Sequence, residues 1–319
     1  MKSENENDSS SIVVRVSIKS SLASRQYTTR SGWTVSTLVD LSNRETFEKR
    51  FPFLKLNDNE CVLLDDNGGG HINPRKFVSS QKKVACMQGC HIINSVACSA
   101  ELLKDDIHVV KTESNEIIKA KRLLIATGAF ANLKDLDVLK PLTLKRCKTT
   151  AVMLKIPEDE ALRLSSMPCV IKRNDKTAFG AYVLPPVKYP DENYYIKLGG
   201  SFTCETGEEL KTLEELRKWY LSDGDETMTF TLIQFMKELI PGLKFTDVSR
   251  MTCVTCYTPT DLPYIDRVSP TVTIAISGNG KGAKFSDEVG RIAAHLSLTG
   301  QWDSELPQNH FRAIFQETF

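Results

Sequence analysis

The sequence predicts a mixed α/β fold in which an α/β half is interleaved with an antiparallel-sheet half. Three features predict it. A proline-led amphipathic helix at 74–87 precedes short apolar strands, which is typical of α/β organisation. Strand-like segments then alternate over 149–198 with short connections, as antiparallel strands do. Near the end, an apolar strand runs through several glycines into a helix, over 272–298.

Composition narrows the class of protein. The chain has 319 residues, enough for about two domains. Forty-one Lys and Arg oppose forty Asp and Glu, so the net charge of +1 gives no electrostatic reason to expect nucleic acid or an anionic membrane as a partner. No apolar run reaches the roughly 18–20 residues that span a bilayer. Residues 1–11 are polar and acidic, so we expect a disordered tail there and no secretory signal.

Cysteine and histidine usage predicts neither a disulfide framework nor a metal centre. The nine cysteines are odd in number and irregularly spaced. We expect most of them to be reduced, buried and apolar in role. Only five histidines are present, so we expect no dedicated metal site.

In the first third of the chain, an apolar run at 12–16 is followed by a weak pattern up to Arg50. Residues 61–64 predict a short buried strand, and the glycines at 65–70 predict a loop. Asn73 and Pro74 then predict a helix start.

The helix is expected to end before Gly89, which suits a C-terminal cap. Further strands are predicted at 90–93, 107–110, 117–126, 149–156, 168–172, 178–184, 194–198, 249–257 and 272–277. Further helices are predicted at 212–221, 227–239 and 286–298.

Three segments carry candidate chemistry. The strand at 125–129 ends in Thr127-Gly128, where backbone can approach a ligand closely, although a tight turn after any core strand has the same pattern. The glycines at 276–285 stand between a strand and a helix and offer N–H groups to an anion or a polar ring edge. A plain glycine loop is the alternative, since the segment is not a GxGxxG dinucleotide motif.

The third segment is Cys253-Val-Thr-Cys256, followed by proline-rich turns up to Asp266. Zinc would need a second ligand pair, which the sequence lacks. Thiol–disulfide exchange would need a helix start after a strand, whereas this pair lies in a strand-like stretch.

Taken in order, the motifs resemble a known family. They are GGHINPR at 69–75, IATGAF at 125–130, Cys253 with the turn to Asp266, and GKGAKF at 280–285. This order is similar to that in FAD-dependent amine oxidoreductases of the D-amino-acid-oxidase-like superfamily. Monomeric sarcosine oxidase and peroxisomal sarcosine/pipecolate oxidase are the most similar group, and the resemblance covers residues 12–300. It implies FAD-dependent oxidation of the C–N bond of a small amino acid or secondary amine, with oxygen as acceptor.

The resemblance also implies roles for individual residues. Cys253 matches the cysteine that links covalently to the flavin, and Lys197 matches an oxygen-activating lysine. Lys284 and Arg15 match residues that bind the substrate carboxylate. Backbone contacts to the cofactor are implied at Val96, Thr127, Gly128, Gly278, Gly280, Lys281 and Gly282. Core or solvated roles remain the alternatives for Cys253 and Lys197.

The resemblance further implies two domains. The FAD-binding domain would comprise 12–20, 61–140 and 248–319, and the substrate domain 21–60 and 141–247. Lys281 and Ala283 stand where the family has a histidine and an aromatic residue, and a further family histidine is replaced near Ser201. We therefore expect a substrate pocket different from that of a sarcosine oxidase.

The sequence also lacks the family's opening strand, GxGxxG turn and helix, which would hold the FAD pyrophosphate. A truncated gene model or splice form, a remnant without activity, and completion by another chain are the three explanations. A non-catalytic binding module that holds no FAD is the alternative function. The C-terminus ends in ETF rather than a peroxisomal SKL address, so cytosol is the expected compartment. Oligomeric state is left open.

Overall fold

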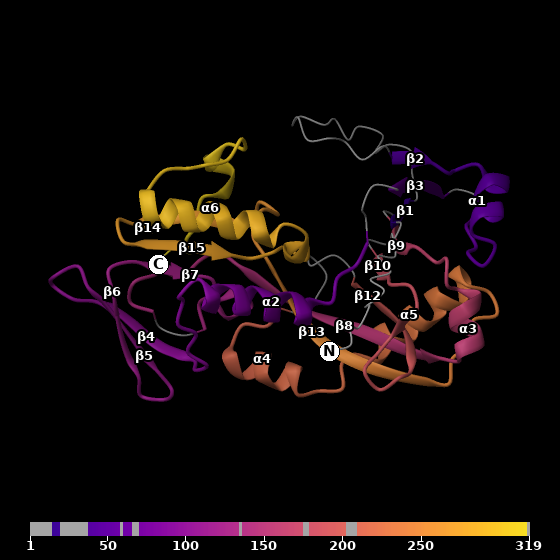
Figure 1. The fold of residues 1–319 in the computed structure, drawn as a ribbon, viewed down its shortest axis with the longest axis horizontal. Helices are drawn as coiled ribbons and strands as arrows, with labels where there is room; N and C mark the ends of the chain where they lie inside the picture. The colour runs from indigo at the N-terminus through magenta and orange to yellow at the C-terminus, as the bar shows by residue number, and fades with distance from the viewer. Residues whose placement is uncertain are drawn as a thin grey trace, which may run out of the picture. The chain divides into compact units, whose positions relative to one another are not determined.

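A computed structural model describes residues 15–19, 38–57, 60–65, 70–133, 136–174, 179–201 and 209–317 (Figure 1). The expected tail at 1–11 lies outside these residues. The chain divides into two compact units. Unit 1 comprises Met1–Ile72, Thr150–Thr203 and Asp223–Met251, and unit 2 comprises Asn73–Thr149, Cys204–Ser222 and Thr252–Phe319.

A large sheet with the strand order β13-β8-β12-β10-β9-β1-β3-β2 dominates unit 1, and β11 pairs with β12 beside it. The described pairs are antiparallel except for β1 with β9. The strands are β1 (Arg15–Lys19), β2 (Leu38–Asp40), β3 (Cys61–Asp65), β8 (Lys145–Ile156), β9 (Cys169–Asn174), β10 (Phe179–Val183), β11 (Val187–Lys188), β12 (Tyr194–Ser201) and β13 (Asp247–Tyr257). The unit boundary falls within β8 and β13.

One face of this sheet carries the core of unit 1. Alternate residues of neighbouring strands are buried together, including Val152, Leu154, Val170, Ile196 and Leu198. Helix α5 (Glu226–Leu239) packs against β12 and adds Leu232, Phe235 and Met236 to the same cluster. The opposite sheet face is therefore where polar side chains of these strands project.

Two shorter helices of unit 1 were not predicted. They are α1 (Arg44–Arg50) and α3 (Glu158–Arg163). The side chain of Asn43 accepts a hydrogen bond from Thr46 N at 3.0 Å, which caps the start of α1. Phe47 is the only buried residue of α1, so the helix has too little apolar periodicity to be recognised from sequence.

Unit 2 holds two three-stranded sheets. Their orders are β14-β15-β7 and β4-β5-β6. The strands are β4 (Ala97–Leu102), β5 (His108–Thr112), β6 (Ile117–Ala120), β7 (Leu123–Ile125), β14 (Tyr264–Ser269) and β15 (Val272–Ile276). Helix α6 (Ser286–Thr299) lies along β14 and β15 (Figure 1) and buries Ile292, Ala293 and Leu296. The strand–glycine–helix unit predicted at 272–298 is confirmed.

The other helices of unit 2 also begin where they were predicted to begin. Helix α2 (Pro74–Met87) starts after Asn73, whose side chain accepts from the N–H groups of Arg75 and Lys76. Gly89 follows it with φ of +88°, a backbone conformation that favours glycine. Helix α4 (Leu213–Tyr220) follows Thr212, which forms a capping box with Glu215.

Two strand predictions were wrong. Residues 90–93 form no strand, and β4 begins only at Ala97. The apolar stretch 117–126 divides into β6 and β7, which belong to different sheets. A single apolar run cannot show that its two halves pair with different neighbours.

Two segments that we expected in the FAD-binding domain pair instead with strands of unit 1. β1 pairs with β9 and β3, so 15–19 and 61–65 belong to the sheet of unit 1. In the described part of the chain, no helix has the length and apolarity needed to cross a membrane.

The cysteines only partly follow the expectation that they are reduced and buried. Seven described cysteines lie outside disulfides, whereas Cys147 is disulfide-bonded. Cys86, Cys90 and Cys253 are exposed, so the prediction of burial is wrong for these three.

Candidate functional site

The glycine-rich loop after β15 is fixed to the end of β13. Ser277 and Asn279 both have positive φ, at +71° and +48°, and both are buried. Ser277 Oγ donates to the carbonyl of Cys256 at 2.6 Å, and Asn279 N donates to the same oxygen at 3.2 Å. The Asn279 side chain in turn accepts from Thr258 N at 2.8 Å. These bonds hold the loop in one conformation beside β13.

The glycines of this loop leave its backbone uncovered by side chains, so a ligand could approach the backbone closely. A Cβ atom at Gly278 would lie 2.8 Å from Gly282 Cα, and Gly280 has φ of +69°. Neither the Gly280 nor the Gly282 N–H has an acceptor among the described residues. Donors of this kind can reach the polar edge of a ring or an anion.

The two lysines of the loop differ in their surroundings. Lys281 Nζ forms an ion pair with Asp261 Oδ2 at 2.6 Å, so its ammonium group already has an anionic partner. Lys284 ends the single 3-10 turn η3 (Gly282–Lys284) directly before α6, and it is exposed.

Cys253 and Cys256 have opposite environments on β13. Cys253 is exposed, and its backbone carbonyl accepts a hydrogen bond from Trp219 Nε1 at 2.8 Å. Cys256 is only 6% exposed, and burial raises the pKa of its thiol. A thiolate is the reactive form of cysteine, so Cys253 is the better nucleophile of the two. Neither thiol is in a disulfide, and the described residues contain no group of three or more His, Cys, Asp or Glu arranged to hold a metal ion.

A buried arginine holds the turn that follows β7. The turn contains Gly128, which has φ of +56° and no atom within 4 Å of where a Cβ would stand. Arg146, on β8, is 4% exposed and donates to the carbonyls of Ala129 at 2.8 Å, Ala131 at 2.5 Å and Leu210 at 3.3 Å. One side chain therefore fixes the backbone on both sides of Phe130, two residues after Gly128.

Replacing Arg146 with Met should destabilise unit 2 and loosen this turn. The change removes the donors of three carbonyl oxygens, those of Ala131 and Leu210 in buried bonds, and each buried loss costs about 1–3 kcal/mol. We expect the free energy of unfolding in urea to fall by at least ~2 kcal/mol. Arg291→Met is the matched control, because Arg291 and its carboxylate partners, Glu288 and Asp303, are all exposed, so this variant should lose little stability. Equal stability of the parent and Arg146→Met would contradict the assigned role.

Contacts within unit 2 join these segments. Gly280 approaches Thr255, Trp219 bonds to Cys253, and Tyr220 stacks on Phe130 of the Gly128 turn. We call the joined surface the unit 2 strip; it consists of residues 127–130, 219–220, 253–257 and 277–284. Val96 precedes β4 and is 49% exposed, and its carbonyl accepts from Glu113 N at 2.9 Å. Among the described residues, the hydrogen bonds of the Val96 carbonyl go to Glu113 and Cys98 and not to the strip.

Lys197 belongs to unit 1 and lies on the sheet face opposite the core. Its neighbours Ile196 and Leu198 are fully buried in the core cluster, whereas Lys197 is half-buried. It pairs with Met153 of β8, and its carbonyl accepts from Leu184 N at 2.8 Å.

Arg15, also predicted at the site, lies on β1 and pairs with Cys169 of β9; the structure describes its backbone only.

Cys169 also lies close to a histidine. Its Sγ atom is 3.5 Å from His71 Nδ1. Burial lowers the pKa of His71, so this imidazole is neutral at pH 7.

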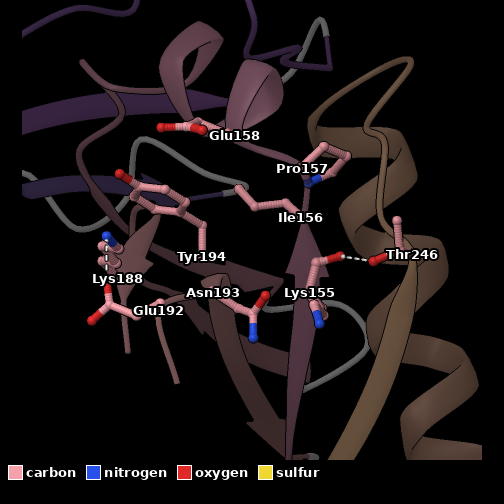
Figure 2. Close-up of a pocket in the computed structure, with 9 residues that line it drawn as sticks. All are labelled: Lys155, Ile156, Pro157, Glu158, Lys188, Glu192, Asn193, Tyr194 and Thr246. Carbon is pink, nitrogen blue, oxygen red and sulfur yellow. Dashed lines mark hydrogen bonds and ion pairs between the residues drawn. The ribbon is translucent and has the colours of Figure 1, made fainter. Parts of the chain in front are cut away.

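A surface cleft of about 360 Å³ in unit 1 contains none of the predicted residues. Figure 2 shows its lining, where Lys188 pairs with Glu192 at 2.6 Å and Thr246 Oγ1 donates to the carbonyl of Lys155. An ion pair with both partners largely exposed is a common surface feature, and it indicates no chemistry here.

Comparison with known proteins gives the same family as the motifs. The model of a family described as FAD dependent oxidoreductase matches residues 22–296. Monomeric sarcosine oxidase from Streptomyces avermitilis is 26% identical over 271 residues, which are 82% of this chain and 65% of that protein. The chain thus spans slightly less than two thirds of the curated relative.

Solved structures share the fold. A fructosyl peptide oxidase mutant is 15% identical with a TM-score of 0.74, covering 94% of this chain and 74% of that one. Fructosyl amine:oxygen oxidoreductase from Aspergillus fumigatus is 16% identical with a TM-score of 0.69, covering 94% and 69%. At these identities the likeness concerns the fold alone.

The residues of the unit 2 strip fit the ring end of a flavin. They supply an exposed thiol, glycine backbone that approaches closely, two N–H groups without acceptors and open space at Gly128. A flavin ring system has one polar edge that accepts hydrogen bonds and one apolar edge, so it needs this combination of groups.

Proposed function

The chain belongs to the family of FAD dependent oxidoreductases, and on that premise we propose that it oxidises the C–N bond of a small amino acid or secondary amine with oxygen as acceptor. The observation that carries the proposal is the unit 2 strip. It brings together, in one unit, the exposed Cys253, the turn that contains Gly128 and the glycine loop after β15. Core packing alone requires neither an exposed thiol nor open N–H groups.

FAD would supply the hydride acceptor for the amine and pass the electrons to oxygen. Cys253 would hold it through a bond from Sγ to the 8α-methyl carbon. Forming this bond would break the S–H bond and one methyl C–H bond. The two electrons and two protons released would reduce one O2 to H2O2. Cys256 is the poorer candidate because burial keeps its thiol protonated.

The remaining residues would bind substrate and stabilise charge. Lys284 and Arg15 would bind the substrate carboxylate through charge-assisted hydrogen bonds. Lys197 would place an ammonium group where oxygen gains negative charge as it is reduced. The N–H groups of Gly280 and Gly282 would donate to the polar edge of the cofactor. The sequence contains no GxGxxG, so no residue is assigned to the pyrophosphate.

The departures at Lys281 and Ala283 affect the substrate that we propose. The resemblance puts a histidine and a bulky aromatic residue at these positions. Here Lys281 pairs with Asp261, and Ala283 is small and exposed. The substrate class is therefore a secondary amine or amino acid that is bulkier than sarcosine.

An absorption spectrum of the purified full chain tests the proposal. We expect a flavin spectrum, either as purified or after FAD is added, and H2O2 release with a panel of N-alkyl amino acids. A colourless protein that added FAD does not change would contradict the proposal and favour a non-catalytic binding module.

A further inference from the structure

Two half-exposed aromatic side chains of the unit 2 strip have been given no contact with the cofactor: Tyr220, which lies near Cys253, and Phe130, which stacks on Tyr220. The rings of Phe130 and Tyr220 stack with centroids 6.5 Å apart and an interplanar angle of 11°. Phe130 is 46% exposed and Tyr220 is 41% exposed. A nearly parallel pair of rings that keeps this much surface open can pack against a further planar group.

Tyr220 is held close to Cys253 from several directions. It ends α4, where the neighbouring Trp219 is buried and bonds to the carbonyl of Cys253. Thr252 Oγ1 donates to the carbonyl of Tyr220 at 3.3 Å. Burial raises the pKa of Tyr220, and the nearby Cys253 raises it further, so the phenol stays protonated. The ring is therefore a neutral aromatic surface next to the thiol.

Phe130 is fixed by the turn that contains Gly128. Its N–H donates to the carbonyl of Thr127 at 3.0 Å, and Arg146 binds the carbonyl of the preceding Ala129. The Phe130–Tyr220 pair thus connects the Gly128 turn to the strand of Cys253. The sequence predicts cofactor contacts in both segments but predicts none at the two aromatic residues.

We propose that Phe130 and Tyr220 form the contact surface for the dimethylbenzene end of the flavin. The proposal rests on the proposed function, because attachment through the 8α-methyl carbon would place that ring two covalent bonds from the Cys253 sulfur. Side chains beside this sulfur would then contact the ring. The ring edge is apolar and carries two methyl groups, so phenyl and phenol surfaces match it and polar side chains do not.

The test measures FAD binding and attachment in matched variants of the full chain. Tyr220→Ala and Phe130→Ala should each weaken the apparent FAD affinity, measured by flavin fluorescence quenching in a Cys253→Ser background, by about fivefold. In chains that retain Cys253, both should lower the fraction of flavin that stays with acid-precipitated protein. Tyr220→Phe keeps the ring and should stay within about twofold of the parent.

Two controls separate contact from folding. Phe230→Ala removes an aromatic side chain that is 63% exposed in unit 1 and should leave both readouts unchanged. Tyr220→Leu keeps apolar volume in α4 without a planar ring, so a folded Tyr220→Leu protein should still lose affinity.

Parent-like FAD binding and attachment in Tyr220→Ala, Tyr220→Leu and Phe130→Ala would overturn the inference and leave the proposed function standing. A parent chain that binds no FAD would overturn both.

Discussion

Replacing Cys253 with Ser should abolish acid-stable flavin while the protein remains folded. The hydroxyl is a far weaker nucleophile than a thiolate, so no bond to the 8α-methyl carbon should form. Because Cys253 is exposed and its structural bond to Trp219 uses the backbone carbonyl, the substitution should change the free energy of unfolding by less than ~0.5 kcal/mol. The measurement is flavin absorbance in the acid-precipitated, redissolved protein.

Cys256→Ser is the matched control on the same strand. Cys256 is buried and its pKa is raised, so its loss should cost stability and leave flavin attachment in place. A result in which Cys256→Ser loses acid-stable flavin and Cys253→Ser keeps it would reverse the assignment of the two thiols.

Replacing Lys197 with Met should slow the reaction with oxygen far more than the oxidation of substrate. Methionine keeps most of the side-chain volume and removes the ammonium group that would stabilise reduced oxygen. Loss of one such electrostatic contact typically costs 10²–10³-fold, so we expect reoxidation by O2 to slow by about 100-fold or more. Anaerobic reduction by substrate in a stopped-flow instrument should stay within about threefold of the parent rate.

Lys155→Met offers a comparison on the same sheet. Lys155 lies on β8, pairs in register with Tyr195 and lines the surface cleft of unit 1 (Figure 2). Its loss should affect neither half-reaction. If Lys197→Met and Lys155→Met reoxidise at the same rate, oxygen activation does not depend on Lys197.

Local signals predicted the elements whose ends are marked by particular residues. Helix α2 begins after Asn73 and Pro74 and ends before Gly89, and the glycines after β15 indicate the start of α6. Signals of this kind act within a few residues and can therefore be read from sequence. The missed helix α1 has an asparagine cap and only one buried side chain, so its apolar pattern was too weak.

Residues with distant partners could not be recognised in the same way. In the sequence, Arg146 looks like an ordinary arginine of a strand. Its three acceptors, the carbonyls of Ala129, Ala131 and Leu210, lie close to it only in the folded chain. The stack of Phe130 on Tyr220 likewise joins residues that are far apart in the chain. The resemblance to a family identified Cys253 from the sequence. Only the structure shows that Cys253 is exposed and Cys256 is buried.

Peptide mapping of the purified chain shows whether Cys253 carries the flavin. Trypsin should release residues 251–267 as one peptide that contains both Cys253 and Cys256. We expect this peptide to carry the mass of a flavin and its fragmentation to place that mass on Cys253. An unmodified peptide from FAD-saturated protein, or a flavin on Cys256, would contradict this expectation.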